Sequence, residues 1–148
     1  MTGTDLYDDV IMDHIRNARN YRVLEDADCK ATGNNPLCGD EIVLYVNVAV
    51  DRVNDIAFQC ACCGISMASA SIMTEMVKGK LAQEVKALLR DFTAMISGRG
   101  NLLQDDAGPE WRAILDTVQR FPARARCAAL PWSTLDDALA RKSAVSVR

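Results

Sequence analysis

Alternating apolar and polar positions in the first half of the chain predict a small antiparallel sheet. Every second residue from 42 to 50 is apolar, as in a strand that buries one face. The predicted buried face carries Ile42, Leu44, Val46, Val48 and Val50. Asp51 and Arg52 suit a turn, and residues 53–58 suit a returning strand, which together give a hairpin. A third short strand is expected over residues 28–33.

Apolar residues at helical spacing predict one helix before these strands in the chain and several after them. The expected helices span residues 5–17, 65–77, 81–96, 109–118 and about 133–141. The second of these is rich in Ala, Ser and Met, and such small side chains allow close packing on a sheet. Residues 142–148 are expected to fray. The predicted class is α+β: a three-stranded antiparallel sheet with helices packed on one face.

Length and composition favour an ordinary globular protein. With 148 residues, 49% of them hydrophobic and 25% charged, the chain is expected to form one domain, 1–148, with its core over about 5–140. A formal net charge of −3 disfavours general nucleic-acid binding. The sequence shows no secretory leader and no apolar run near the ~20 residues that span a bilayer. We therefore expect a cytoplasmic protein with no membrane partner.

Thiols and one carboxylate suggest a metal site. In a reducing compartment, six cysteines are expected to be ligands or reactive thiols rather than a disulfide framework. Cys38, Asp40, Cys63 and Cys127 occupy three separate segments, and together they suffice to hold zinc or a small iron–sulfur cluster. Gly39 allows the tight turn that would let Cys38 and Asp40 face one ion. The alternative is that the three distant cysteines are buried core residues.

Several motifs in this chain resemble those of one known family. The matching stretches are Leu6-Tyr7, Ile11-Met12-Asp13-His14, Asn35-Pro36-Leu37-Cys38-Gly39-Asp40, Cys63-Gly64-Ile65-Ser66-Met67-Ala68-Ser69-Ala70-Ser71 and Phe121-Pro122-Ala123-Arg124-Ala125-Arg126-Cys127-Ala128. In these stretches the chain resembles the scaffold family of iron–sulfur cluster assembly: IscU, the N-terminal domain of NifU, and SufU. The resemblance runs from about residue 5 to 140. Arg126, where IscU members carry His, and the long segment 97–121 favour the SufU branch.

The resemblance implies a function as well as a fold. Its implied partners are a PLP-dependent cysteine desulfurase of the SufS type, which delivers sulfur as a persulfide, and downstream cluster-assembly or apo iron–sulfur proteins. It implies a metal held by Cys38, Asp40, Cys63 and Cys127, with Cys38 as sulfur acceptor. The SufU branch favours Zn²⁺ and sulfur transfer. Two alternatives remain open: a scaffold for a transient [2Fe–2S] cluster on the same cysteines, or a non-catalytic zinc-binding docking module. Whether the protein acts as an enzyme, a zinc-dependent sulfurtransferase, or as a scaffold also stays open.

Other residues near these motifs have open roles. Arg124 joins Cys38 and Asp40 as a candidate catalytic residue, because its cation can contact a partner or the charge of the site; a solvated surface is the alternative. Cys60 and Cys62 replace a Gly-x-Gly motif that is usual in the family. They can compete as ligands, form a transient disulfide or be small thiols without function, and we expect them to be dispensable for metal binding and sulfur transfer. His14 is expected to be a surface or packing residue.

Overall fold

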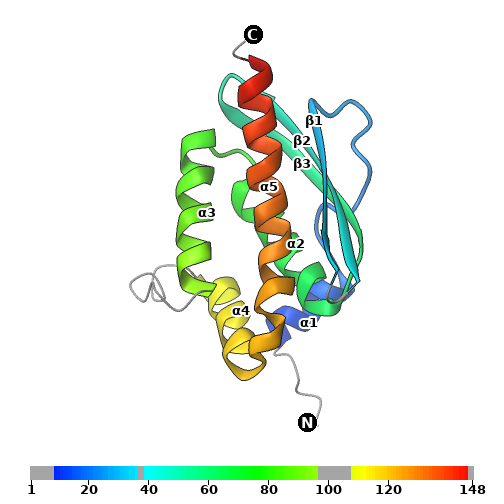
Figure 1. Ribbon diagram of the computed structural model, residues 1–148, viewed down its shortest axis with the longest axis vertical. Coiled ribbons are helices and arrows are strands. Elements are labelled where there is room, and N and C mark those ends of the chain that lie inside the picture. Colours follow the sequence, from blue (N-terminus) through cyan, green and yellow to red (C-terminus); the bar gives the residue numbers. More distant parts are fainter. Residues whose placement is uncertain (1–8, 37–38, 97–107, 147–148) are drawn as a thin grey trace.

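The computed structural model describes residues 9–36, 39–96 and 108–146. The elements are α1 (Asp9–Arg16), β1 (Cys29–Asn35), β2 (Asp40–Ala49), β3 (Arg52–Ala61), α2 (Gly64–Val77), α3 (Ala82–Ile96), α4 (Gly108–Arg120), the short 3₁₀ helix η2 (Pro122–Arg124) and α5 (Ala125–Ser146). The three strands form one antiparallel sheet in the order β1-β2-β3. The helices pack on one face of this sheet (Figure 1), so the predicted α+β class is confirmed.

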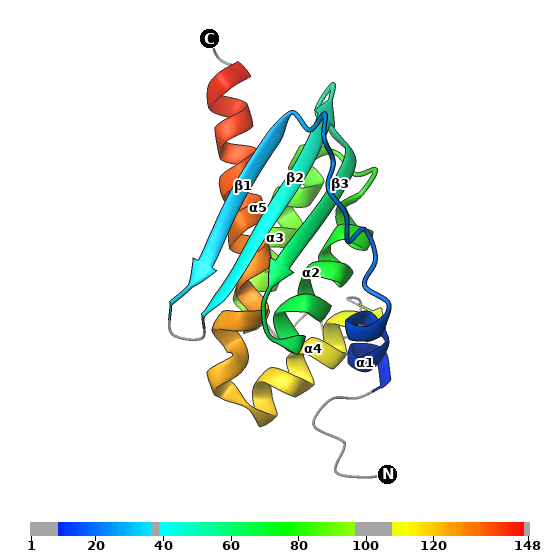
Figure 2. The ribbon, with the colours of Figure 1, turned by 90° about the vertical axis from the view of Figure 1, so that its right-hand side faces the viewer.

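The sheet is built from the alternation that the sequence shows. Leu44 of β2 lies opposite Phe58 of β3, and Val46 lies opposite Ile56; all four side chains are buried. This apolar face is turned toward the helices, and Figure 2 views the sheet from its other side. The strands therefore bury one face under the helices, as period-two patterning requires.

The prediction that Val50 belongs to the buried face was wrong. A register shift lies between Asn47 and Val48, and the chain turns at Val50 and Asp51, whose φ angles are +50° and +64°. Positive φ at both central positions characterises the type I′ turn, which matches the twist of a hairpin. As a result Val50 is 92% exposed. The bulge and the turn, both set by strand pairing, override the alternation.

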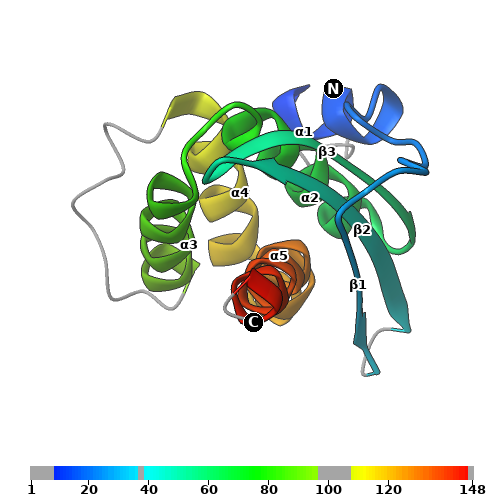
Figure 3. The ribbon, with the colours of Figure 1, turned by 90° about the horizontal axis from the view of Figure 1, so that it is seen from above.

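Helix α2 lies at the centre of the helical layer. It contacts α1, α4, α5 and β3, and its small side chains permit this close approach. Figure 3 shows α2 and α5 next to the sheet, with α3 farther out. Polar groups of α2 are buried there but hydrogen-bonded: the Ser69 hydroxyl donates to the carbonyl of Ala128 at 2.6 Å and accepts from the Trp132 indole at 3.0 Å. Buried hydroxyls thus join α2 to α5.

Helix α5 is longer than predicted. We expected a helix from about residue 133 to 141, but it begins at Ala125 and continues to Ser146 with Pro131 inside it. Proline has no N–H, so the carbonyl of Cys127, four residues earlier, cannot be satisfied within the helix. That carbonyl instead accepts a hydrogen bond from the Ser66 hydroxyl at 2.8 Å. A partner on α2 therefore replaces the hydrogen bond that Pro131 removes.

Aromatic side chains close the far side of the core. Phe92 of α3 stacks on Trp132 of α5 with ring centroids 4.3 Å apart, and Trp111 of α4 meets both rings edge-on. Within the described residues, no helix combines the length and the apolar character needed to cross a bilayer.

Candidate metal centre

Three of the four predicted ligands converge at one end of the sheet. Asp40 begins β2, Cys63 joins β3 to α2, and Cys127 lies in the first turn of α5. One ligand atom from each of them lies within 4.8 Å of the others. Asp40 and Cys127 are buried and Cys63 is half-buried. Cys38, the fourth predicted ligand, lies outside the described residues, in the connection between β1 and β2.

Gly39 supports the predicted turn beside Cys38. Its φ is +73°, in the region that favours glycine, and its N–H donates to the Asn35 carbonyl at 2.8 Å. The turn ends at Asp40, which pairs with Asn35 across the hairpin. The backbone is therefore reversed immediately before the carboxylate of the cluster.

The carboxylate of Asp40 is held at the N-terminus of α2. Its Oδ1 accepts from the backbone N–H of Cys63 at 3.0 Å, and its Oδ2 accepts from the Ser66 hydroxyl at 3.1 Å. Cys63 is the N-cap residue of α2, and its own side chain makes no capping bond. Asp40 thus caps this helix from another strand, and its charge faces the positive end of the helix dipole.

Ser66 connects the three groups of the cluster, and the sequence reasoning missed it. Its hydroxyl lies within hydrogen-bond distance of Asp40 Oδ2 and the Cys127 carbonyl, and the Cys63 thiol lies 3.7 Å away. A single hydroxyl hydrogen can serve only one acceptor at a time. The available signal was spacing: a residue three positions after Cys63 lies on the same helical face.

The donor set fits a thiophilic divalent metal. Zinc binds thiolate sulfur at about 2.3 Å in tetrahedral sites, which puts neighbouring sulfurs roughly 3.8 Å apart. The separations of up to 4.8 Å between the ligand atoms of Asp40, Cys63 and Cys127 require only small rotations to reach that spacing. A carboxylate buried beside two thiols also gains from a nearby cation. These three residues and a fourth ligand would complete a four-coordinate site.

Two arginines precede Cys127 in the chain. Arg124 ends η2 and is half-buried, whereas Arg126 is the second residue of α5 and is exposed. Both stand within three residues of Cys127, so the expected positive charge does lie close to the site in the chain. A catalytic role for Arg124 stays a prediction.

The remaining cysteines do not join this cluster. Cys60 and Cys62 form a disulfide with 5.5 Å between their Cα atoms, one of the options that the sequence left open. The thiol of Cys29 donates to the carbonyl of Ala138 at 3.2 Å, at the contact of β1 with α5. One bond between residues two positions apart is not a disulfide framework, so it agrees with the expectation for the six cysteines. A disulfide across a single intervening residue adds little to the stability of the fold. We therefore consider a chemical role for it below.

His14 lies in the helical layer rather than at the cluster. It is 3% exposed, and its Nδ1 lies 2.6 Å from the Ser71 hydroxyl of α2. Burial lowers the pKa of His14, and the Arg19 cation lowers it further, although nearby carboxylates partly oppose this. The neutral ring is therefore the form that the fold favours.

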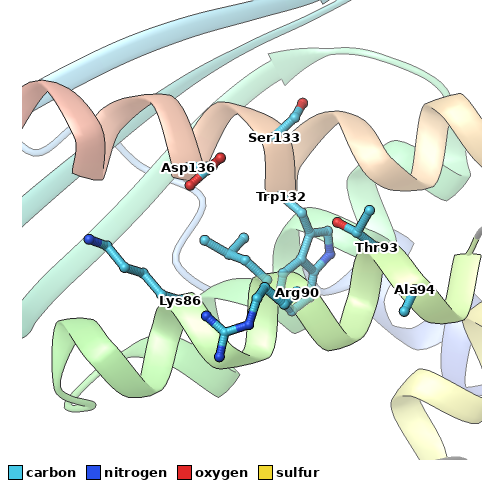
Figure 4. Close-up of a pocket in the computed structure, with 8 residues that line it drawn as sticks. Lys86, Arg90, Thr93, Ala94, Trp132, Ser133 and Asp136 are labelled. Atoms are coloured by element: carbon cyan, nitrogen blue, oxygen red, sulfur yellow. The ribbon is translucent and has the colours of Figure 1, made fainter. Parts of the chain in front are cut away.

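A groove of about 540 Å³ lies between α3 and α5. Figure 4 shows Lys86 and Arg90 of α3 on one side and Trp132 and Asp136 of α5 on the other. No cysteine or histidine is among the described residues that line it. The described lining offers one carboxylate, Asp136, and no thiol, so the thiol cluster is the stronger candidate for metal and sulfur chemistry.

A three-stranded antiparallel sheet with helices on one face, and a cluster of two thiols and a carboxylate at its end, are the features to compare with known proteins. The sequence model of the NifU-like N-terminal domain matches residues 6–128, and the chain belongs to this family.

Several known proteins are similar to this chain over most of its length. The zinc-dependent sulfurtransferase SufU of Bacillus subtilis strain 168 is 40% identical over 137 residues, which are 93% of this chain and 91% of SufU. The iron–sulfur cluster assembly scaffold protein IscU of Streptococcus pyogenes serotype M1 is 37% identical, with 93% and 85% covered. A solved structure of SufU from Fervidobacterium islandicum AW-1 superposes with a TM-score of 0.84 at 32% identity, covering 93% of this chain and 99% of that one.

Proposed function

We propose that this chain is an iron–sulfur cluster assembly protein that accepts persulfide sulfur from a cysteine desulfurase at a zinc site. The ligands would be Cys38, Asp40, Cys63 and Cys127. The observation that carries the proposal is the convergence of Asp40, Cys63 and Cys127 within 4.8 Å. The relative named as a zinc-dependent sulfurtransferase supports zinc as the resident metal.

The acceptor step needs a thiolate that can leave the metal. Bound zinc would keep the cysteines deprotonated. In the proposed step the Cys38 thiolate attacks the outer sulfur of the desulfurase persulfide. The desulfurase cysteine departs as a thiolate, and the sulfur atom stays on Cys38 as a new persulfide. No net oxidation or reduction occurs in this transfer.

Asp40 suits a site in which one ligand can leave the metal. Its Oδ1 keeps the hydrogen bond from the Cys63 N–H, and its Oδ2 shares the Ser66 hydroxyl with the Cys127 carbonyl, so its charge is not left bare when its bond to a metal is broken. Carboxylate is also a harder ligand than thiolate. We therefore assign to Asp40 the role of exchangeable ligand, and to Arg124 that of attracting the negatively charged persulfide.

A scaffold for a transient [2Fe–2S] cluster on the same cysteines is the second candidate. The similarity to a protein named as an iron–sulfur cluster assembly scaffold favours it. Arg126 favours the first candidate, because an arginine does not ligate iron whereas a histidine at this position can. Metal analysis separates the two: one zinc in a colourless protein supports sulfur transfer, and iron with sulfide in a brown protein supports the scaffold. If the protein binds zinc but accepts no sulfur, the result supports the third hypothesis, a non-catalytic zinc-binding docking module.

The deciding experiment combines sulfur transfer with matched variants. A cysteine desulfurase is mixed with wild-type protein, with Cys38→Ala and with Cys29→Ala, and the bound sulfur is located by mass spectrometry. We expect Cys38→Ala to stay folded and accept no sulfur. Cys29→Ala should behave as wild type, because Cys29 bonds to Ala138 away from the cluster. Acceptance by Cys38→Ala at the wild-type rate would move the acceptor elsewhere, with Cys62 the first suspect.

A further inference from the structure

The Cys60–Cys62 disulfide directly precedes Cys63 in the chain, and it is not part of the group formed by Asp40, Cys63 and Cys127 in the described residues. We propose that this pair, in its dithiol form, reduces sulfane sulfur held on the site and releases it as sulfide. This activity rests on the proposed function, because its substrate is a persulfide. It begins after sulfur has been accepted, so metal binding and acceptance stay independent of the pair.

Strand register places the pair next to the cluster. Cys60 lies opposite Ile42, and the last paired residues of β2 and β3 are Glu41 and Ala61. Ile42 and Asp40 are two residues apart on β2 and share a face, so Cys60, the partner of Ile42, lies on the face that carries Asp40. Cys62 follows the last residue of β3 and is joined to Cys60 by the disulfide.

The chain itself joins the pair to the second group of the cluster. Cys62 directly precedes Cys63, so their Cα atoms are about 3.8 Å apart. The Cys63 N–H is in turn held by Asp40. Among the described thiols of the site, Cys63 is therefore the one that Cys62 adjoins in the chain.

The pair is as accessible as Cys63 and more accessible than the other two groups of the cluster. Cys60 and Cys62 are half-buried and Ala61 between them is exposed, whereas Asp40 and Cys127 are buried. An external thiol can therefore reach the disulfide and reopen it. Thiol–disulfide exchange needs this access to the sulfur that is attacked.

The backbone around Cys60 is fixed independently of the disulfide. The Tyr21 hydroxyl donates to the Cys60 carbonyl at 3.1 Å and accepts from the Cys60 N–H at 3.3 Å. The Cys60 sulfur also contacts the Met67 sulfur at 4.0 Å. These contacts keep Cys60 near Cys62 when the bond is open, so closure needs little rearrangement.

The reaction balances in two steps. The Cys62 thiolate attacks the outer sulfur of a persulfide, the carrier cysteine departs as a thiolate, and Cys62 becomes the persulfide. The Cys60 thiolate then attacks Cys62 Sγ and expels hydrosulfide, which forms the Cys60–Cys62 disulfide seen in the structure. Two thiols are oxidised to the disulfide and one sulfane sulfur is reduced to sulfide. An external dithiol reductant returns the pair to its active form.

The test measures sulfide in the absence of any other thiol. Desulfurase that carries its persulfide, freed of cysteine, is mixed with reduced wild-type protein. We expect about one sulfide per chain, together with formation of the Cys60–Cys62 disulfide, at the stoichiometry of the steps above. A Cys60→Ser, Cys62→Ser double variant should retain the accepted persulfide and release at least about tenfold less sulfide. Cys29→Ser is the matched control and should release sulfide as wild type.

Two further measurements make the result decisive. Cys60→Ser alone should trap the sulfur on Cys62, where peptide mass mapping locates it. Loading with a low-molecular-weight alkyl persulfide bypasses the desulfurase, so a failure of sulfur acceptance is distinguished from a failure of reduction. Wild-type sulfide release by the double variant would overturn the proposal. Absence of release by wild-type protein with both persulfide sources would overturn it as well.

Discussion

The Ser66 hydroxyl lies 3.1 Å from Asp40 Oδ2, and both groups are almost fully buried. This contact links the central helix to the first residue of β2. It also places a neutral donor beside the charge of the candidate metal site. Ser66 therefore positions Asp40 and is not itself expected to bind a metal.

Replacement of Ser66 by Ala should lower both stability and metal retention. The change removes one of two donors to a buried carboxylate, which costs about 1–3 kcal/mol in the free energy of unfolding. Chemical denaturation of metal-free protein measures this cost, and zinc release to a chromogenic chelator measures retention. Ser133→Ala is the control, because Ser133 donates only to the Leu130 carbonyl of its own helix. Equal effects of the two variants on zinc release would show that Ser66 has no special link to the site.

Asp40→Asn should speed zinc release while the protein stays folded. Asn keeps the volume and the acceptor oxygen that caps the Cys63 N–H, but it loses the charge that favours a cation. We expect release at least about tenfold faster, in the range seen when metal sites are perturbed. Exposed Asp137→Asn serves as the control. Unchanged release from Asp40→Asn would remove Asp40 from the ligand set.

Removal of the metal should lower the melting temperature. Structural zinc sites contribute roughly 10–16 kcal/mol of apparent binding free energy, and binding to the folded state alone stabilises that state. Differential scanning calorimetry before and after chelation, with zinc restored as the control, measures the shift. Identical melting of loaded and metal-free protein would show that the site is not coupled to the fold.

His14 should make stability depend on pH in a defined window. Burial lowers its pKa in the folded state, so the unfolded chain binds the proton more readily. Its contribution is complete above the unfolded pKa of about 6.5 and is lost as pH falls from there toward the folded pKa. His14 is the only histidine of the sequence, so in metal-free protein His14→Gln should flatten the curve of unfolding free energy against pH over this range. Ser71→Ala keeps the ring and should retain the slope; a slope unchanged in His14→Gln would refute the assignment.

Replacing the two central residues of the hairpin turn should stabilise the protein. Val50 adopts φ of +50°, which is costly for a β-branched side chain, and its side chain is exposed. Val50→Asn with Asp51→Gly gives the preferred type I′ pair. We expect about 0.5–1 kcal/mol of added stability, measured by chemical denaturation. Val48→Asn, in the adjoining strand, is the contrasting variant and should destabilise; a destabilised turn variant would contradict the turn assignment.

Much of the fold could be predicted because its signals are local. The alternation through Ile42, Leu44 and Val46 predicts a strand wherever one face is buried, and helical spacing predicts α2 and α3 in the same way. The candidate site could also be predicted, because cysteines are few and the family resemblance singles out Asp40 among the 20 acidic residues. Asp40, Cys63 and Cys127 do converge in the structure.

The tertiary structure decided what depends on a distant partner. Pro131 is tolerated inside α5 because the Cys127 carbonyl, which it leaves without a helical donor, meets the Ser66 hydroxyl 61 residues away in sequence. Strand pairing shifted the register before Val50 and moved that side chain into water. Periodicity is a property of neighbouring residues, whereas a hydrogen bond between helices depends on how the whole chain packs. The sequence by itself therefore determined the elements and the ligand types, and packing alone decided how Ser66, Asp40 and Cys127 meet.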